Sequence, residues 1–173
     1  MAMHSEFERQ FVRPRSGRTL IVGAYITKGK ADRRLLYEDA IGVDMRAGPG
    51  VDMVVDMEDS PDIGRFDHVE CTSVLEHSRR PWLMAEMIEQ AMYPNSTLFV
   101  SVPFNWWPHA YPDDYFRMTT SAVQSLFPNI EWQQLLYVTH DKMVSDPKDL
   151  PSTMVNKHRY YARTITCGFG TRR

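Results

Sequence analysis

The sequence has few of the features that mark secreted or membrane-bound proteins. Its 173 residues include only two cysteines, Cys71 and Cys167, which stand far apart and outside any CxxC spacing. Neither a disulfide framework nor a cysteine zinc site is therefore expected. No stretch approaches the roughly 18 apolar residues of a membrane span, and the N-terminus lacks an apolar signal segment. We expect a cytoplasmic protein with two reduced, buried cysteines.

An excess of charge of one sign is also missing. The formal net charge of -2 and the pI of about 6.3 create no basic field that would attract nucleic acid or an anionic membrane. A small polar ligand suits this balance better. The length is typical of one domain. Residues 1–18 are polar, arginine-rich and end in turn-forming residues, so we expect an N-terminal arm followed by a single domain over residues 19–173.

Short apolar runs rich in β-branched residues recur along this domain and predict buried strands. They cover residues 19–23, 40–44, 51–56, 66–72 and 97–102, and two further strands are predicted over 132–139 and 163–168. Helices are predicted over residues 30–39, 81–91 and 120–127. A polar, proline-containing stretch over 141–158 joins the last two strands. This alternation predicts an α/β fold with a doubly wound, mainly parallel sheet.

Residues that follow the predicted strands are candidates for ligand binding, because ligands of such sheets bind beyond the carboxyl ends of the strands. Gly23 ends the first strand, and Asp44 ends the second, 44 − 23 = 21 residues later. Nucleotide-binding βαβ units place an acid roughly 20 residues beyond the glycine that approaches the ligand. We therefore expect Asp44 to hold a ribose, with capping of the following turn as the alternative.

The second half of the chain carries further residues in a recognisable order. The segment FDHVECTSVLEH at 66–77 is followed by Pro81, a turn at 94–95, a strand over 98–103 and then His109, Pro112, Asp114, Tyr115, Arg117 and Thr119. With these segments, and over about residues 19–127, the chain resembles the class I S-adenosylmethionine-dependent methyltransferases, in particular the type 11-like group. The resemblance implies a Rossmann-like sheet with strand order 3-2-1-4-5-7-6, an antiparallel seventh strand, and S-adenosyl-L-methionine as the cofactor.

The same resemblance implies which residues contact the cofactor. Asp44 would accept hydrogen bonds from both ribose hydroxyls, and Gly23 would let the ligand approach the backbone closely. The adenine would lie against acidic and apolar side chains. The implied cofactor-binding residues are Gly23, Asp44, Met45, Asp56, Met57 and Ser73. Asp56 can equally cap a turn, and the two methionines can be ordinary core residues.

The loop after the first strand departs from the family pattern acid-x-Gly-x-Gly-x-Gly. Gly23 is in place, but Tyr25 and Thr27 stand at the next two glycine positions, and the acid is missing. Tyr25 could fold over the cofactor, and Lys28 could reach a carboxylate. Two alternatives to a methyltransferase stay open. One is a non-catalytic methyltransferase-like binding or interaction module, and the other is a nicotinamide-dependent oxidoreductase, which also uses an acid after the second strand.

The long loop between the fifth strand and the next helix predicts an acceptor site, since loops of this length usually carry function. The resemblance implies in-line methyl transfer to a small-molecule or sugar-type acceptor. His109 is the first candidate for a base that takes a proton from the acceptor, and His77 is the second, because histidine changes charge near neutral pH. The side chains expected around the acceptor are Trp106, Trp107, Tyr111, Tyr115 and Arg117.

Several of these side chains also have structural interpretations. Glu76 stands where a helix begins, and the helix dipole alone favours an acid there. Trp106 and Trp107 can pack on the preceding helix or form a homo-oligomer contact. Arg117 can pair with a nearby aspartate. No metal is expected, because the acidic and histidine side chains of the loop match no compact metal motif. The basic residues over 28–34 are expected to form a solvated helix face.

Overall fold

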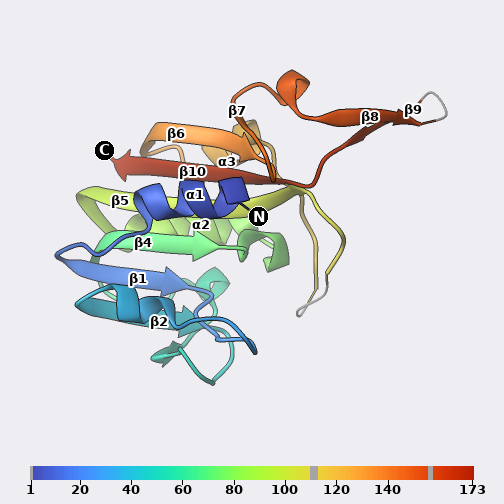
Figure 1. The fold of residues 1–173 in the computed structure, drawn as a ribbon. Helices are drawn as coiled ribbons and strands as arrows, with labels where there is room; N and C mark the ends of the chain where they lie inside the picture. The colour runs from blue at the N-terminus through green and yellow to red at the C-terminus, as the bar shows by residue number, and fades with distance from the viewer. Residues whose placement is uncertain (1, 110–112, 156–157) are drawn as a thin grey trace.

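The computed structural model describes residues 2–109, 113–155 and 158–173, and its main sheet has the strand order β3-β2-β1-β4-β5-β10-β6-β7. β1 to β5 are parallel, whereas β10 runs antiparallel to β5 and β6 (Figure 1). The strands are β1 (Arg18–Val22), β2 (Asp39–Asp44), β3 (Met53–Val54), β4 (Phe66–Thr72), β5 (Met92–Asn105), β6 (Ile130–Val138), β7 (Met143–Val144) and β10 (Thr164–Arg172). The predicted doubly wound sheet and its order are confirmed. β10 is the antiparallel seventh strand of that order, and β7 is an added edge strand.

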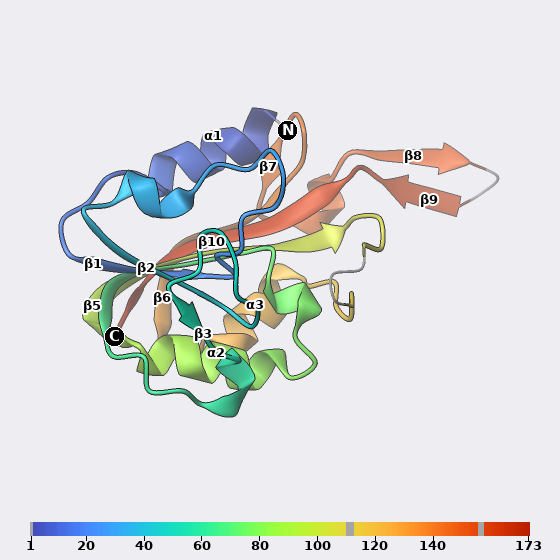
Figure 2. The same cartoon turned by 90° about the horizontal axis from the view of Figure 1, so that it is seen from below.

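Helices cover both faces of this sheet (Figure 2). α1 and η1 lie on one face, and α2 and α3 lie on the other. The helical segments are α1 (Ala2–Phe11), η1 (Arg33–Leu36), η2 (Met57–Asp59), η3 (Leu75–His77), α2 (Pro81–Gln90), α3 (Thr120–Leu126) and η4 (Pro147–Asp149). A separate hairpin of β8 (Ser152–Val155) and β9 (His158–Tyr161) extends away from the sheet (Figure 1). Within the described ranges, no helix is long and apolar enough to cross a membrane.

The larger part of the core lies between the sheet and helices α2 and α3. α2 begins with Pro81, whose missing N–H leaves no hydrogen bond unmade in the first helical turn. Met84, Ala85 and Ile88 are buried, as their helical spacing predicts. Trp82 in the same helix is 54 % exposed. Two helical positions rotate a side chain by about 200°, so Trp82 lies on the opposite side of α2 from Met84.

The opposite face of the sheet is covered by N-terminal residues, where the sequence predicts a polar arm. These residues form α1, and Phe7 and Phe11 stand four positions apart on one side of it. Phe7 is fully buried, with its ring centroid 6.2 Å from that of Phe99 on β5. Phe11 stacks on Phe169 of β10 at 4.5 Å. Aromatic contacts with the sheet thus hold a helix whose own sequence is mostly polar. Both cysteines are free and buried, as predicted.

The connection between β1 and β2, which the structure describes in full, contains no α-helix, although the sequence predicts one over residues 30–39. Only η1 forms there, and Leu35 and Leu36 are exposed. Arg33 turns toward the sheet instead, where its Nε donates to a Glu70 carboxylate oxygen at 2.7 Å. The expected solvated basic face is therefore wrong for Arg33, because the buried carboxylate of Glu70 on β4 needs a cationic partner.

The third strand is shorter than the predicted range 51–56. The Asp52 side chain accepts the Gly42 N–H at 2.7 Å, and the Asp56 side chain accepts a backbone N–H at the start of η2. The backbone still pairs with β2 at both ends of β3, through the Asp52 N–H to the Gly42 carbonyl and the Val55 N–H to the Asp44 carbonyl, and the Asp56 cap then starts η2. The other predicted strands are present, and β5 and β10 extend beyond their predicted bounds. The polar stretch over 141–158 contains β7, η4 and β8.

Candidate functional site

The loop after β1 begins at Gly23, which has a φ of 73°. A Cβ atom at this position would lie 2.3 Å from Cγ2 of Val74 in the loop after β4. The Gly23 N–H donates to the Val43 carbonyl at 2.9 Å, and the Ile26 N–H donates to the Pro49 carbonyl at 2.8 Å. The loop therefore bends across the end of β2. Both the positive φ and the neighbouring Val74 require a glycine here.

Asp44 lies at the carboxyl end of β2, where the sequence predicts a ribose ligand. Its side chain is only 12 % exposed. One carboxylate oxygen accepts the Tyr25 N–H at 3.2 Å, and the other accepts the Arg46 N–H at 3.0 Å. The Arg46 guanidinium lies 4.2 Å from the centre of the Tyr25 ring. Asp44 thus joins the loops that follow β1 and β2, and Tyr25 and Arg46 stack together beside it.

The other residues implied to contact the cofactor have different environments. Asp56 accepts a backbone N–H at 2.9 Å and caps η2, which is the alternative role stated for it above. Met57 is buried in the core, whereas Met45 is 52 % exposed. Ser73 is exposed, has a φ of 54°, and donates its N–H to the Ser101 carbonyl at 2.9 Å. Of these four residues, Met45 and Ser73 are accessible to a ligand.

The segment η3 places Glu76 in the interior just beyond β4. Its side chain has no exposed surface, and neither carboxylate oxygen has a hydrogen-bond partner among the described residues. Burial raises the pKa of Glu76 to about 8. The backbone carbonyl of Glu76 accepts the N–H groups of Tyr115 and Phe116 at 2.8 Å and 3.3 Å. These bonds hold the end of the long loop against η3.

Two histidines lie beside this carboxylate. His77 follows Glu76 directly, and His109 comes from the long loop after β5. The Nε2 atom of each histidine lies 3.8 Å from Oε1 of Glu76, and the two rings meet edge to face with their centroids 4.9 Å apart. On the other side of each ring, His77 Nδ1 lies 2.5 Å from the Asp113 carbonyl, and His109 Nδ1 lies 3.3 Å from a carboxylate oxygen of Asp114. The structure thus brings both predicted bases to one carboxylate.

Asp114 and Arg117 form an ion pair next to His109. The guanidinium donates to both carboxylate oxygens, and the His109 N–H donates to one of them at 2.7 Å. The hydrogen bonds from Arg117 hold the pKa of Asp114 well below its usual range. Arg117 also donates to the Trp107 carbonyl at 3.1 Å. Its charge is therefore compensated within the loop, which is the pairing given above as the alternative to binding an anionic acceptor.

The aromatic side chains expected around the acceptor are largely exposed. Trp107 is 66 % exposed, and Trp106 and Tyr115 are each 39 % exposed. The guanidinium of Arg163 lies over both tryptophan rings, 5.5 Å and 5.6 Å from their centres. Even with Arg163 over them, the exposed fractions of Trp106 and Trp107 leave both side chains accessible to a ligand. Tyr111 lies outside the described residues.

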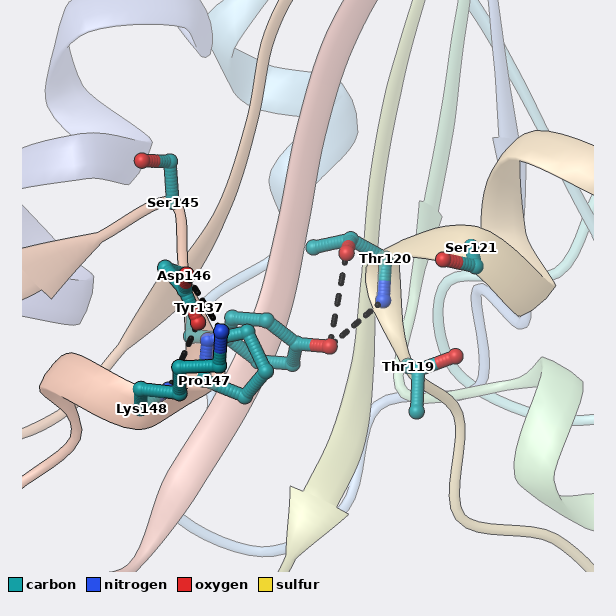
Figure 3. Close-up of a pocket in the computed structure, with 8 residues that line it drawn as sticks. All are labelled: Thr119, Thr120, Ser121, Tyr137, Ser145, Asp146, Pro147 and Lys148. Atoms are coloured by element: carbon teal, nitrogen blue, oxygen red, sulfur yellow. Dashed lines mark hydrogen bonds and ion pairs between the residues drawn. The ribbon is translucent and has the colours of Figure 1, made fainter.

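A cavity of about 470 Å³ lies between the start of α3 and the segment after β7 (Figure 3). It is lined by Thr119, Thr120, Ser121, Tyr137, Ser145, Asp146, Pro147 and Lys148. The Tyr137 hydroxyl points across it and accepts the Thr120 N–H at 3.2 Å. Among the described residues, none of the predicted site residues lines this cavity, so it is separate from the histidine cluster.

No protein-family model and no curated protein matches the sequence. Solved structures do match it along almost its entire length. YcgJ from Bacillus subtilis is 12 % identical with a TM-score of 0.65, and the match covers 98 % of this chain and 97 % of YcgJ. The N-methyltransferase NodS from Bradyrhizobium japonicum, solved with S-adenosyl-L-homocysteine, is 8 % identical with a TM-score of 0.62, covering 98 % and 85 % of the two chains.

A third match is the 1,6-didemethyltoxoflavin-N1-methyltransferase from Burkholderia thailandensis, with bound 1,6-didemethyltoxoflavin and S-adenosylhomocysteine. It is 14 % identical with a TM-score of 0.63, and the match covers 99 % of this chain and 75 % of that one. The chain has the class I methyltransferase fold. With this fold, Gly23, Asp44 and Ser73 follow the adjacent strands β1, β2 and β4 along one edge of the sheet.

Asp44 and Asp56 differ in the hydrogen-bonding capacity that they retain. Each carboxylate oxygen can accept two hydrogen bonds, and each oxygen of Asp44 accepts one backbone N–H, so both retain accepting capacity. The Asp44 side chain is only 12 % exposed, and Nε of Arg46 lies 3.7 Å from one of its oxygens, so a ligand would reach it only if neighbouring side chains moved aside. Asp56 caps η2.

The role of Glu76 is not evident from the sequence, which favours a helix-terminal acid at this position. The Leu-Glu-His segment and the loop histidine are both recognisable in the sequence, but their contact depends on how the long loop folds back. The sequence therefore contains no local signal that combines the three residues.

Proposed function

We propose that this chain is an S-adenosylmethionine-dependent methyltransferase that acts on a small-molecule acceptor, with a sugar-type hydroxyl as the first candidate. The fold supports this, as do the positions of Gly23 and Asp44. The observation that carries the proposal is the cluster of Glu76, His77 and His109. Glu76 follows two residues after Val74, whose side chain packs at Gly23. Potential proton acceptors therefore stand beside the loop that would carry the cofactor.

The cofactor would supply a methyl group already bonded to a good leaving group. The protein would mainly have to align the acceptor with it, and alignment can contribute several kcal/mol. Asp44 would bind the ribose hydroxyls, and Trp106 and Tyr115 would line the acceptor. Asp114 can only accept a hydrogen bond from His109 Nδ1, so His109 Nε2 carries the lone pair that can take a proton. His77 is the second candidate for this role.

A second candidate function is a methyltransferase-like module without catalysis. One specific feature favours it: both oxygens of Asp44 bind backbone N–H groups, and Tyr25 and Arg46 cover the carboxylate. An acid whose hydrogen bonds hold two loops together can be retained for folding alone.

Calorimetric titration with S-adenosylhomocysteine distinguishes the two functions, because this product binds without turnover. We expect one equivalent to bind to the unchanged protein. Asp44→Asn should weaken binding at least tenfold, because the loss of the charged acceptor weakens both hydrogen bonds to the ribose. Asp52→Asn is the matched control. Asp52 also accepts a backbone N–H and pairs with an arginine, but it lies at the start of β3, so affinity should be unchanged.

The absence of heat at millimolar S-adenosylhomocysteine would reject the enzyme and favour the non-catalytic module. Equal affinities of the Asp44→Asn and unchanged proteins would instead reject the ribose assignment while leaving cofactor binding intact.

A further inference from the structure

We propose that Glu76, His77 and His109 form a binding site for one divalent transition-metal ion, with Zn²⁺ as the best match. One oxygen of Glu76 lies 3.8 Å from the Nε2 atoms of both histidines, and one ligand atom from each residue falls within 4.8 Å of the others. Tetrahedral zinc with bonds of about 2.0 Å holds its ligand atoms roughly 3.3 Å apart. Movements of about 0.8 Å by each of two side chains would therefore bring ligand atoms that lie as far as 4.8 Å apart to this spacing.

The hydrogen bonds on the far side of each ring leave the correct nitrogen available. His77 Nδ1 faces the backbone carbonyl of Asp113, and His109 Nδ1 faces the carboxylate of Asp114. Both partners can only accept a hydrogen bond, so Nδ1 carries the hydrogen in each neutral ring. Each Nε2 atom then presents a lone pair toward Glu76. Histidines that bind metals nearly always have their other nitrogen held in this way by a carbonyl or a carboxylate.

The carboxylate of Glu76 is the independent observation that points to a ligand. It is completely buried, and both of its oxygens lack a hydrogen-bond partner in the part of the chain that the structure describes. A buried acid without a hydrogen-bond partner is destabilising whether it is ionised or protonated, and the lone pairs of the two neighbouring imidazoles have no partner at Glu76 either. The distance of 3.8 Å is too long for a hydrogen bond to either ring. A cation bound between the three side chains would provide a partner for the Glu76 oxygen and for the lone pairs of both imidazole nitrogens.

The donor set indicates which ions would bind. Two imidazole nitrogens and one carboxylate suit Zn²⁺, Fe²⁺ and neighbouring first-row ions, whereas Mg²⁺ and Ca²⁺ prefer oxygen ligands. Three protein ligands also leave at least one coordination position open, as in catalytic zinc sites. The His109 side chain is 40 % exposed, so this position is accessible from solvent. The sequence gives no sign of the site, because its ligands come from segments far apart in the chain.

A role for the ion in methyl transfer rests on the proposed function, whereas binding of the ion does not. An acceptor hydroxyl bound at the open position would lose its proton to solvent water more easily, because the metal charge stabilises the alkoxide. The alkoxide oxygen would then form a bond to the methyl group as the bond from that group to the sulfonium breaks, and S-adenosylhomocysteine would leave. In that case His77 and His109 would act as ligands and would not accept the proton.

The test is calorimetric titration of ZnCl₂ into protein that has been treated with EDTA and dialysed, in the absence of any cofactor. We expect binding with one-to-one stoichiometry. His77→Ala and His109→Ala should each weaken it by about 100-fold or more, and Asp114→Asn should weaken it about tenfold, because Asp114 orients a ligand. His140→Ala is the matched control, since His140 also pairs with an aspartate but lies outside the cluster. It should leave the affinity unchanged.

Two further measurements keep the result decisive if a histidine variant folds poorly. Glu76→Gln removes the ligand charge with little change in shape, and it should abolish the rise in Tm that Zn²⁺ causes in the unchanged protein. Co²⁺ should give the visible absorption of a tetrahedral nitrogen and oxygen site in the unchanged protein only. No stoichiometric binding, or equal binding by the His109→Ala and His140→Ala proteins, would overturn the proposal. Since S-adenosylhomocysteine binding is measured separately, the metal site and the proposed function can fail independently.

Discussion

The two halves of the sheet use their carboxylates in opposite ways. In the half formed by β1 to β3, Asp44, Asp52 and Asp56 each accept backbone N–H groups and hold loops in place. Beyond β4, Glu76 is buried without such a partner among the described residues and faces two histidines. An acid at the end of a strand is therefore not in itself a ligand site. The hydrogen bonds that it already makes distinguish a structural acid from one that is available for chemistry.

The two faces of the sheet are also covered differently. α2 and α3 pack against one face through a large apolar core that includes residues of β1 and β2, whereas on the other face the connection from β1 to β2 has only a short 3-10 helix. Arg33 of that helix pairs with Glu70 on β4 and with Glu8 on α1. Tyr37 also donates its hydroxyl to Glu70. Ion pairs and a hydrogen bond to the buried Glu70 thus attach this connection to the sheet, whereas elsewhere a packed helix covers it.

The largest effect is expected from Arg33→Ala. It leaves Glu70, which is 3 % exposed, without its cationic partner, and breaking a buried pair in this way costs about 3–5 kcal/mol of unfolding free energy. Urea denaturation followed by circular dichroism measures the loss. Arg34→Ala is the matched control from the same short helix. Its partners Asp32 and Asp52 are more exposed than Glu70, so the loss should be about 1 kcal/mol or less. Similar losses in the two variants would contradict a special role for the Arg33 pair.

Most of the strands, α2 and α3 could be predicted because their signals are local, whereas the strand order was implied only by the resemblance to the methyltransferase family. Buried strands appear as β-branched runs, Pro81 marks the first turn of α2, and the Thr119 side chain caps α3 by accepting the Ala122 N–H. α1 could not be predicted in this way. Its apolar positions are few among charged residues, and the aromatic partners that stabilise it come from β5 and β10, far along the chain.

The site is predictable as a set of residues but not as an arrangement. The order of residues along the chain is enough to identify His77, His109 and Asp44. Their partners depend on tertiary structure, since the long loop is held to η3 by the carbonyl of Glu76, and Asp44 accepts the N–H of Tyr25. The spacing of residues in the sequence indicates neither contact, so neither the Glu76 cluster nor the hydrogen bonds of Asp44 could be expected.

A smaller effect is expected from Gly23→Ala, which tests how tightly the loop after β1 is fixed to the second half. The new Cβ would require a positive φ and would collide with Val74, costing about 2–4 kcal/mol of unfolding free energy in total. Gly29→Ala separates the two causes. Gly29 also has a positive φ, but no atom of the described residues lies within 4 Å of the place that a Cβ would occupy, so only about 1–2 kcal/mol should be lost. Adding Val74→Ala to the Gly23→Ala protein should recover part of the difference, and no recovery would mean that Val74 is not the cause.

The smallest effects, and the sharpest comparison, are expected when an acid in each half is replaced by its amide, with EDTA present to keep metal away. Asp44→Asn weakens the acceptor of two backbone N–H groups and should lower the unfolding free energy by about 1–2 kcal/mol. Glu76→Gln should raise it by about 1–2 kcal/mol. The swap removes a buried acid that has no hydrogen-bond partner among the described residues and whose pKa of about 8 in the folded protein lies above its unfolded value, so that its burial costs stability at neutral pH. Urea denaturation that shows a lower unfolding free energy for Asp44→Asn and a higher one for Glu76→Gln would support a structural role for Asp44 and a Glu76 that is available to bind a ligand. Losses of equal size would show instead that the Glu76 carboxylate is as much a part of the folded framework as Asp44, and the contrast between the two halves would no longer hold.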